Sequence, residues 1–173
     1  MKKVIPLLIV ILSTTTSTAQ VMKARHIPNQ NIDFVGFAAL TSQLEPLREA
    51  YRISEAEFIE MSKDEDTIIL DTRSAAKYAE LHIKGAVHLN FSDITSDTLA
   101  AIIPTPTTRI LIYCNNNFEN APRPFPVKRA VAALNIPTFI TLYAYGYQSL
   151  YELGPVVDPA TSNIEFAGAA ISK

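Results

Sequence analysis

Cys114, the one cysteine of the chain, carries the side chain best suited to nucleophilic chemistry. It directly follows the apolar run 110–113 and precedes the polar segment 115–120. If that run is a buried strand, loop amides and the N-terminus of the next helix can point at the sulfur and favour its anionic form. The same position also suits a cysteine that only fills the core. Position alone leaves both interpretations open.

Three consecutive asparagines follow the thiol: Asn115, Asn116 and Asn117. Asparagine adopts left-handed backbone conformations more readily than other non-glycine residues, so we expect these residues to let successive amides converge on the sulfur. The three histidines show no ligand spacing, and neither a metal site nor a cofactor motif is predicted.

Short apolar runs alternate with helical segments along the chain. The predicted strands are residues 67–70, 86–89, 110–113 and 139–142, and the predicted helices are residues 54–62, 74–81, 97–103, 127–134 and 148–153. Ser54 and Glu57 form a capping box at the start of the first of these helices. The alternation predicts an α/β sandwich around a mostly parallel sheet, in which ligands bind at the carboxyl ends of the strands.

Two stretches resemble the signature segments of rhodanese-like domains. Residues 69–73 contain Asp71-Thr72-Arg73, and residues 78–86 read Tyr-x-x-x-His-Ile-x-Gly-Ala, in the order and spacing of that family. Cys114 falls where the family places its catalytic cysteine. Residues 141–156 look like the closing strand, glycine turn and last helix. The resemblance covers about residues 52–158 and implies a three-layer sandwich with a mostly parallel central sheet flanked by helices.

The resemblance also implies a chemistry. A sulfurtransferase of this kind carries sulfur as a persulfide on Cys114 between a small sulfur donor and a thiol or cyanide acceptor, without a cofactor. The implied persulfide-binding loop comprises Asn115, Asn116, Asn117, Phe118 and Glu119. Asp71 and Arg73 would support the surroundings of the loop, and Arg123 and Lys128 are expected to assist electrostatically.

The loop after Cys114 departs from the family pattern, because it lacks glycine and has Glu119 at its fifth place. The negative charge of Glu119 would disfavour an anionic persulfide next to it. We therefore expect one of three arrangements: Glu119 points to solvent, Arg123 or Lys128 offsets its charge, or the pocket does not hold a small anion such as thiosulfate. The related phosphatases need arginine at the sixth place, where this chain has Asn120, so phosphatase activity is not expected.

The chain continues from this loop through a proline-rich segment between Pro122 and Pro126. We expect a stiffened insertion that folds over the pocket or offers a surface to a protein partner. The alternative to the enzyme is therefore a catalytically silent rhodanese-like module that binds a partner through this long loop, with Cys114 only in the core.

Composition limits the function classes. The 173 residues carry 15 Lys and Arg against 17 Asp and Glu, and 48% are hydrophobic, which is typical of one compact domain. The chain has no excess of basic residues, so nucleic-acid binding is not expected.

The N-terminus resembles a secretory signal peptide over residues 1–19. Lys2 and Lys3 precede the apolar run 4–12, and the predicted cleavage follows Ala19. The run is shorter than the roughly 20 residues that span a bilayer, so we expect a periplasmic or secreted protein without stable membrane insertion; an uncleaved anchor is the alternative.

The rest of the chain divides into three parts. Residues 20–51 form a partly helical extension, whose helix we expect to break near Pro46; residues 52–158 form the rhodanese-like domain, and residues 159–173 form a C-terminal tail.

Overall fold

The computed structural model describes residues 27–171, and residues 34–171 belong to one compact unit. The predicted signal peptide lies outside the described residues. The helices are α1 (Phe34–Ala50), α2 (Glu55–Met61), α3 (Ala75–Glu80), α4 (Ser96–Ile102) and α5 (Asn135–Ala144), with short 3-10 helices η1 (Phe91–Asp93), η2 (Asn115–Asn117) and η3 (Ala130–Ala132). The strands are β1 (Arg52–Ile53), β2 (Thr67–Asp71), β3 (His82–Ile83), β4 (Val87–His88), β5 (Arg109–Tyr113), β6 (Leu150–Leu153) and β7 (Phe166–Ala167).

Five parallel strands form the main sheet in the order β1-β6-β5-β2-β4. β2 and β5 pair along their whole length, from Thr67 opposite Arg109 to Asp71 opposite Tyr113. Strands in the middle of a parallel sheet are covered on both faces, which explains their continuous apolar sequences. The predicted α/β class and mostly parallel sheet are confirmed.

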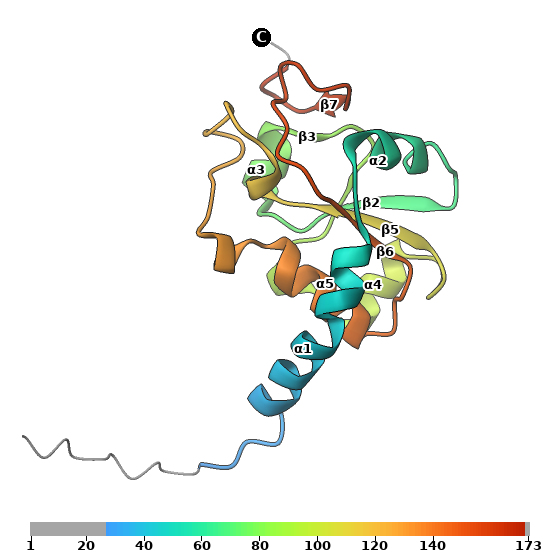
Figure 1. Cartoon of the computed structure of the whole chain (residues 1–173), viewed down its shortest axis with the longest axis vertical. Helices are drawn as coiled ribbons and strands as arrows, with labels where there is room; N and C mark the ends of the chain where they lie inside the picture. The colour runs from blue at the N-terminus through green and yellow to red at the C-terminus, as the bar shows by residue number, and fades with distance from the viewer. Residues whose placement is uncertain (1–26, 172–173) are drawn as a thin grey trace, which may run out of the picture. The chain divides into compact units, whose positions relative to one another are not determined.

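Helices cover the sheet on two sides. Figure 1 shows α2 and α3 with the small antiparallel β3–β7 pair on one side, and α1, α4 and α5 on the other. Each side has its own apolar core: Phe58, Ile69 and Leu111 contribute to the first, and Leu44 and Phe139 to the second. β5 contributes side chains to both cores, so Cys114, which directly follows it, lies at an edge of the sheet between them.

The C-terminal third of the chain differs from the prediction in the order of its elements. Residues 139–142 belong to helix α5 and form no strand, and residues 150–153 form strand β6 where a helix was expected. Residues 127–134 contain only η3. The expected closing strand, glycine turn and last helix are thus in fact a helix, a glycine turn and the closing strand.

The end of α5 explains this correction. Gly146 has φ +94°, its amide donates to Tyr143 O, and the amide of Tyr147 donates to Leu142 O. These two bonds around a left-handed glycine form the Schellman motif that ends many helices. The buried residues Asn135, Thr138, Phe139 and Leu142 follow a helical spacing, which outweighs the strand propensity of the β-branched residues here.

α1 also corrects the prediction, because Pro46 does not end the helix. The helix continues to Ala50, held by the buried Leu44, which belongs to the same core as α5. Its N-terminal half is exposed, including Phe34 and Val35. None of the described helices is long and apolar enough to cross a membrane.

Candidate functional site

Cys114 begins the loop that follows β5, as the sequence predicts. It is extended in backbone conformation and caps η2, where the amide of Asn116 donates to its sulfur at 3.4 Å. The backbone amides of Leu134 and Asn135, at the start of the ten-residue helix α5, act on the thiol as well, because they lower its pKa. Although Leu134 lies 20 positions after Cys114 in the chain, the site therefore joins a loop and a helix N-terminus beside one sulfur atom.

Burial dominates the electrostatics of this thiol, which is only 1% exposed. Removal from water raises the pKa of Cys114, because it disfavours the charged thiolate. The amides of Asn116, Asn135 and Leu134 act in the opposite direction, and the nearby Glu152 carboxylate adds to the increase. The resting residue is therefore a protonated thiol at neutral pH.

Asn117 organises the loop through four side-chain hydrogen bonds. Its Oδ1 accepts from the amide of Cys114 at 2.9 Å and from Asn135 Nδ2 at 3.0 Å. Its Nδ2 donates to Leu153 O at 2.6 Å and to Pro155 O at 3.2 Å. One buried amide group thus links the ends of β5 and β6 to the start of α5.

The three asparagines do not use the left-handed conformation that we expected. Residues 115–117 form the right-handed 3-10 turn η2, and the only described non-glycine residue with positive φ is Asn120, at +56°. Asn116 instead pairs with the backbone of Lys128, donating to its carbonyl at 2.8 Å and accepting from its amide at 3.0 Å. The physical reason for asparagine at positions 116 and 117 is hydrogen bonding.

Asp71 and Arg73 form a buried ion pair on the other face of the sheet. Arg73 Nη2 lies 2.6 Å from Asp71 Oδ2, and the two side chains are 1% and 0% exposed. Tyr113 donates to the same carboxylate oxygen at 2.5 Å. Burial and the Asp71 charge raise the pKa of Tyr113 well above its ordinary value, so its hydroxyl remains a donor. These three residues act as a buried support beside β5.

Arg73 extends this support to the insertion. It donates to Pro124 O at 3.1 Å and to Leu81 O at 2.7 Å. Phe125 is buried, stacks on Phe118 with ring centroids 4.1 Å apart, and lies 4.5 Å from the Arg73 guanidinium. The middle of the proline-rich segment is therefore part of the core, and Pro122 and Pro126 remain at the surface.

The charged residues of the expected loop lie away from the sulfur contacts. Glu119 is exposed, and its amide donates to Val157 O. Arg123 pairs with Glu80 of α3 and its side chain is 84% exposed. Lys128 is exposed and contacts the loop through its backbone. Of the expected arrangements for Glu119, the structure has the one in which this residue is exposed to solvent.

Sequence reasoning missed Glu152 and Asn135, two buried polar residues near the thiol. A glutamate inside an otherwise apolar strand sequence was the available signal, but the strand itself was not recognised. Across residues 27–171, no group of three or more His, Cys, Asp or Glu side chains is placed to hold a metal ion.

Comparison with known proteins agrees with this architecture. Solved structures with the same fold include the BH2092 protein from Bacillus halodurans, at 21% identity and a TM-score of 0.52 over 77% of this chain and 86% of that one. Another is the rhodanese-like domain of the Alr3790 protein from Anabaena sp., at 14% identity and a TM-score of 0.50 over 71% and 83%. A search of curated proteins found no significant match.

The family model for the rhodanese-like domain matches residues 54–153, which is more than half of the chain. This range contains the Asp71–Arg73 pair, the Cys114 loop, α5 and β6. The chain belongs to the rhodanese-like domain family.

Proposed function

We propose that the protein is a sulfurtransferase that carries sulfur as a persulfide on Cys114. The observation that carries this proposal is the place of the Cys114 sulfur, which accepts from the amide of Asn116 at 3.4 Å and whose pKa the amides of Asn135 and Leu134 at the start of α5 also lower. Backbone amides at a helix N-terminus stabilise an anion without needing a basic side chain. Such a site suits a thiolate or a terminal persulfide, both of which carry their charge on sulfur.

The proposed reaction has two balanced steps. Cys114 loses its proton and attacks the outer sulfur of a donor, whose sulfur–sulfur bond breaks as the leaving group takes the electron pair. An acceptor thiol or cyanide then attacks the outer sulfur of the persulfide and releases the Cys114 thiolate. The chain has no second cysteine, so the acceptor is another molecule.

Burial of the thiol supports a second candidate, a rhodanese-like module that binds a peptide or cell-envelope partner without catalysis. Cys114 is 1% exposed, so a donor reaches it only if the loop opens. The partner surface would comprise the exposed parts of the long loop, including Glu119, Pro122 and Pro126. In both cases we propose that the protein acts after export, which rests on the apolar run near its N-terminus.

Intact-protein mass spectrometry distinguishes the two candidates. The protein lacking residues 1–19 is incubated with thiosulfate or with a low-molecular-weight persulfide, and Cys114→Ser is the control. A sulfurtransferase gains the mass of one sulfur atom, which cyanide or excess thiol removes, and the control gains nothing. No gain with either donor in the folded protein would rule out the enzyme and favour the binding module.

A further inference from the structure

A buried carboxylate lies on the same face of the sheet as Cys114. Glu152 of β6 is opposite Ile112 of β5, and Cys114 is two residues beyond Ile112 in extended conformation. Side chains alternate along a strand, so those of Ile112, Cys114 and Glu152 share one face. Glu152 is only 3% exposed, which means that its charge is poorly screened by water.

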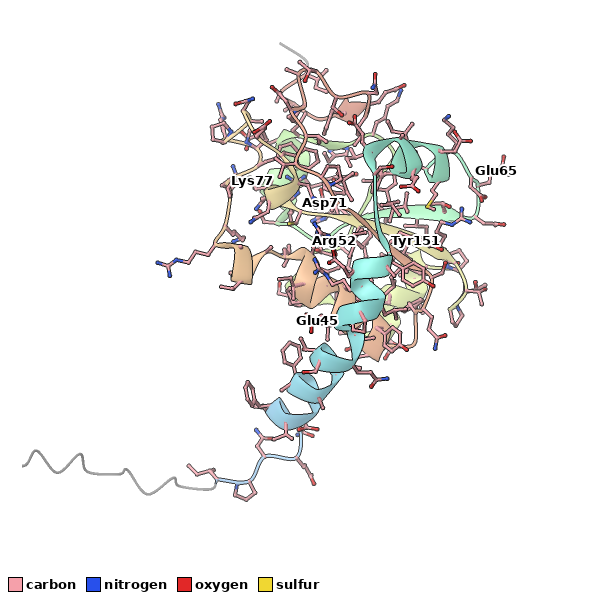
Figure 2. The ribbon with its side chains drawn as sticks, viewed as in Figure 1. Glu45, Arg52, Glu65, Asp71, Lys77 and Tyr151 are labelled. Atoms are coloured by element: carbon pink, nitrogen blue, oxygen red, sulfur yellow. The ribbon has the colours of Figure 1, made fainter. Side chains whose placement is uncertain are left out.

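An arginine from α1 meets this carboxylate. Arg48 Nη2 lies 2.5 Å from Glu152 Oε1, and Arg52 Nε of β1 lies 4.0 Å from the same oxygen. Figure 2 shows Arg52 next to the C-terminal end of α1. α1 lies outside residues 54–153, which match the family model, so Arg48 comes from a part of the chain that this model does not cover.

The polar groups left without a partner belong to the same surroundings. Among the described residues, the buried side-chain atoms that make no hydrogen bond are Arg48 Nε, Asn115 Oδ1, Asn135 Oδ1 and Glu152 Oε2. Two of these residues flank or contact Cys114, and the other two form the ion pair. The unsatisfied polar atoms thus belong to the residues around the sulfur and to the ion pair next to it. Buried polar atoms without partners lower stability, and they are common at functional sites.

The charges around the thiol come from three elements. β6 contributes Glu152, α1 contributes Arg48, and β1 contributes Arg52, whereas α5 contributes backbone amides. The buried Asp71–Arg73 pair lies on the opposite face of the sheet. A carboxylate near a thiol opposes ionisation of that thiol, and a cation paired with the carboxylate cancels much of this effect.

We propose that α1 is part of the Cys114 site and that Arg48 is its positioning residue, because Arg48 neutralises Glu152 and so permits a negative charge on the sulfur. The proposal deepens the proposed function, since an anionic sulfur on Cys114 is what sulfur transfer requires. It does not depend on the identity of the donor. Arg48 acts through Glu152 and needs no contact with substrate.

The test measures the ionisation of Cys114 directly. The rate of alkylation by iodoacetamide is followed from neutral to alkaline pH in the protein lacking residues 1–19, together with the ultraviolet absorbance of the thiolate. Arg48→Met leaves Glu152 with only the more distant Arg52 and should raise the midpoint by about one pKa unit, which slows alkylation about tenfold at neutral pH. Glu152→Gln should lower the midpoint, and Arg48→Lys should keep it close to the wild-type value.

One control variant, and the comparison of the two midpoint shifts, separate an effect of charge from an effect on structure. Arg109→Met removes an arginine that pairs with Asp64 at the far end of β5, and should leave the midpoint unchanged. If Arg48 only tethers α1, Arg48→Met and Glu152→Gln will both speed alkylation at every pH without opposite shifts of the midpoint. That result overturns the proposal. If Arg48→Met does not fold, Glu152→Gln decides alone, and an unchanged or raised midpoint refutes the inference.

The outcome is independent of the sulfur-transfer experiment. Opposite midpoint shifts without a persulfide would support the electrostatic role of Arg48 and contradict the sulfurtransferase. A persulfide without these shifts would support the enzyme and contradict the role of Arg48.

Discussion

At the scale of single residues, the site combines a thiol that resists ionisation with groups that favour it. Burial raises the pKa of Cys114, and three backbone amides act against this increase. On the other face of the sheet, Asp71, Arg73 and Tyr113 satisfy one another in a region with almost no solvent. The groups around Cys114 are suited to holding a negative charge on sulfur. Asp71, Arg73 and Tyr113 are suited to a structural role, because their charges are paired with each other.

We expect Arg73→Met to lower the free energy of unfolding by about 3–5 kcal/mol, because it leaves the buried Asp71 carboxylate without its cation. It also removes the donors to Leu81 O and Pro124 O. Urea denaturation followed by circular dichroism measures the loss. The matched control is Arg123→Met, whose exposed pair with Glu80 should matter little. Equal midpoints for the two variants would contradict this account.

At the scale of elements, the loop after Cys114 depends on a helix that follows it much later in the chain. η2 begins directly after Cys114, yet α5 starts only at Asn135. Asn117 connects the two, since its side chain contacts Cys114 and Asn135 as well as Leu153 at the end of β6. Residues 118–134 can therefore form a long loop while the start of α5 stays next to the sulfur.

Asn117→Ala should destabilise the protein by at least about 2 kcal/mol, because buried donors and acceptors lose their partners. It should also speed the reaction of Cys114 with iodoacetamide, since the loop opens more often. Chemical denaturation and alkylation rates test both effects. Asn163→Ala, at an exposed asparagine, serves as the control and should change neither. Unchanged alkylation in Asn117→Ala would show that this side chain does not hold the loop closed.

At the scale of the whole molecule, distant segments complete the core beside the Asp71–Arg73 pair. Phe125 comes from the insertion, and Ile164 and Phe166 come from the C-terminal segment, where β7 pairs with β3. Gly168 has φ +128°, and a Cβ there would lie 2.7 Å from Glu80 O, so the chain passes close to the end of α3. Residues 159–171 therefore pack as part of the folded unit.

Phe125→Ala should cost about 3–5 kcal/mol of stability, because it leaves a cavity between Phe118 and the Arg73 guanidinium. Thermal and urea denaturation should agree on this loss. Val131→Ala, which shortens an apolar side chain that is 89% exposed, is the comparison and should be nearly neutral. A small effect at Phe125 would mean that the insertion is a flap and contributes little to the core.

Local patterns in the sequence were enough to predict the fold class and the place of Cys114 at the end of a strand. The capping box of Ser54 and Glu57 and the strands around residues 67–70 and 110–113 are confirmed. Cys114 indeed follows a buried strand. These features depend on neighbours in the chain, such as a cap three residues away or an uninterrupted apolar run, so they can be recognised without knowing the fold.

The tertiary structure decided the features that depend on distant contacts. Residues 135–144 are rich in strand-forming side chains, and packing against the sheet and α1 makes them a helix. Phe125 becomes a core residue only because Arg73 and Phe118 surround it. The sequence by itself determined that a thiol lies at the end of a strand. Only the tertiary structure decided that Arg48, 66 positions before Cys114, pairs with the Glu152 carboxylate near this thiol. Burial and charge pairing depend on neighbours in three dimensions, which the order of residues does not show.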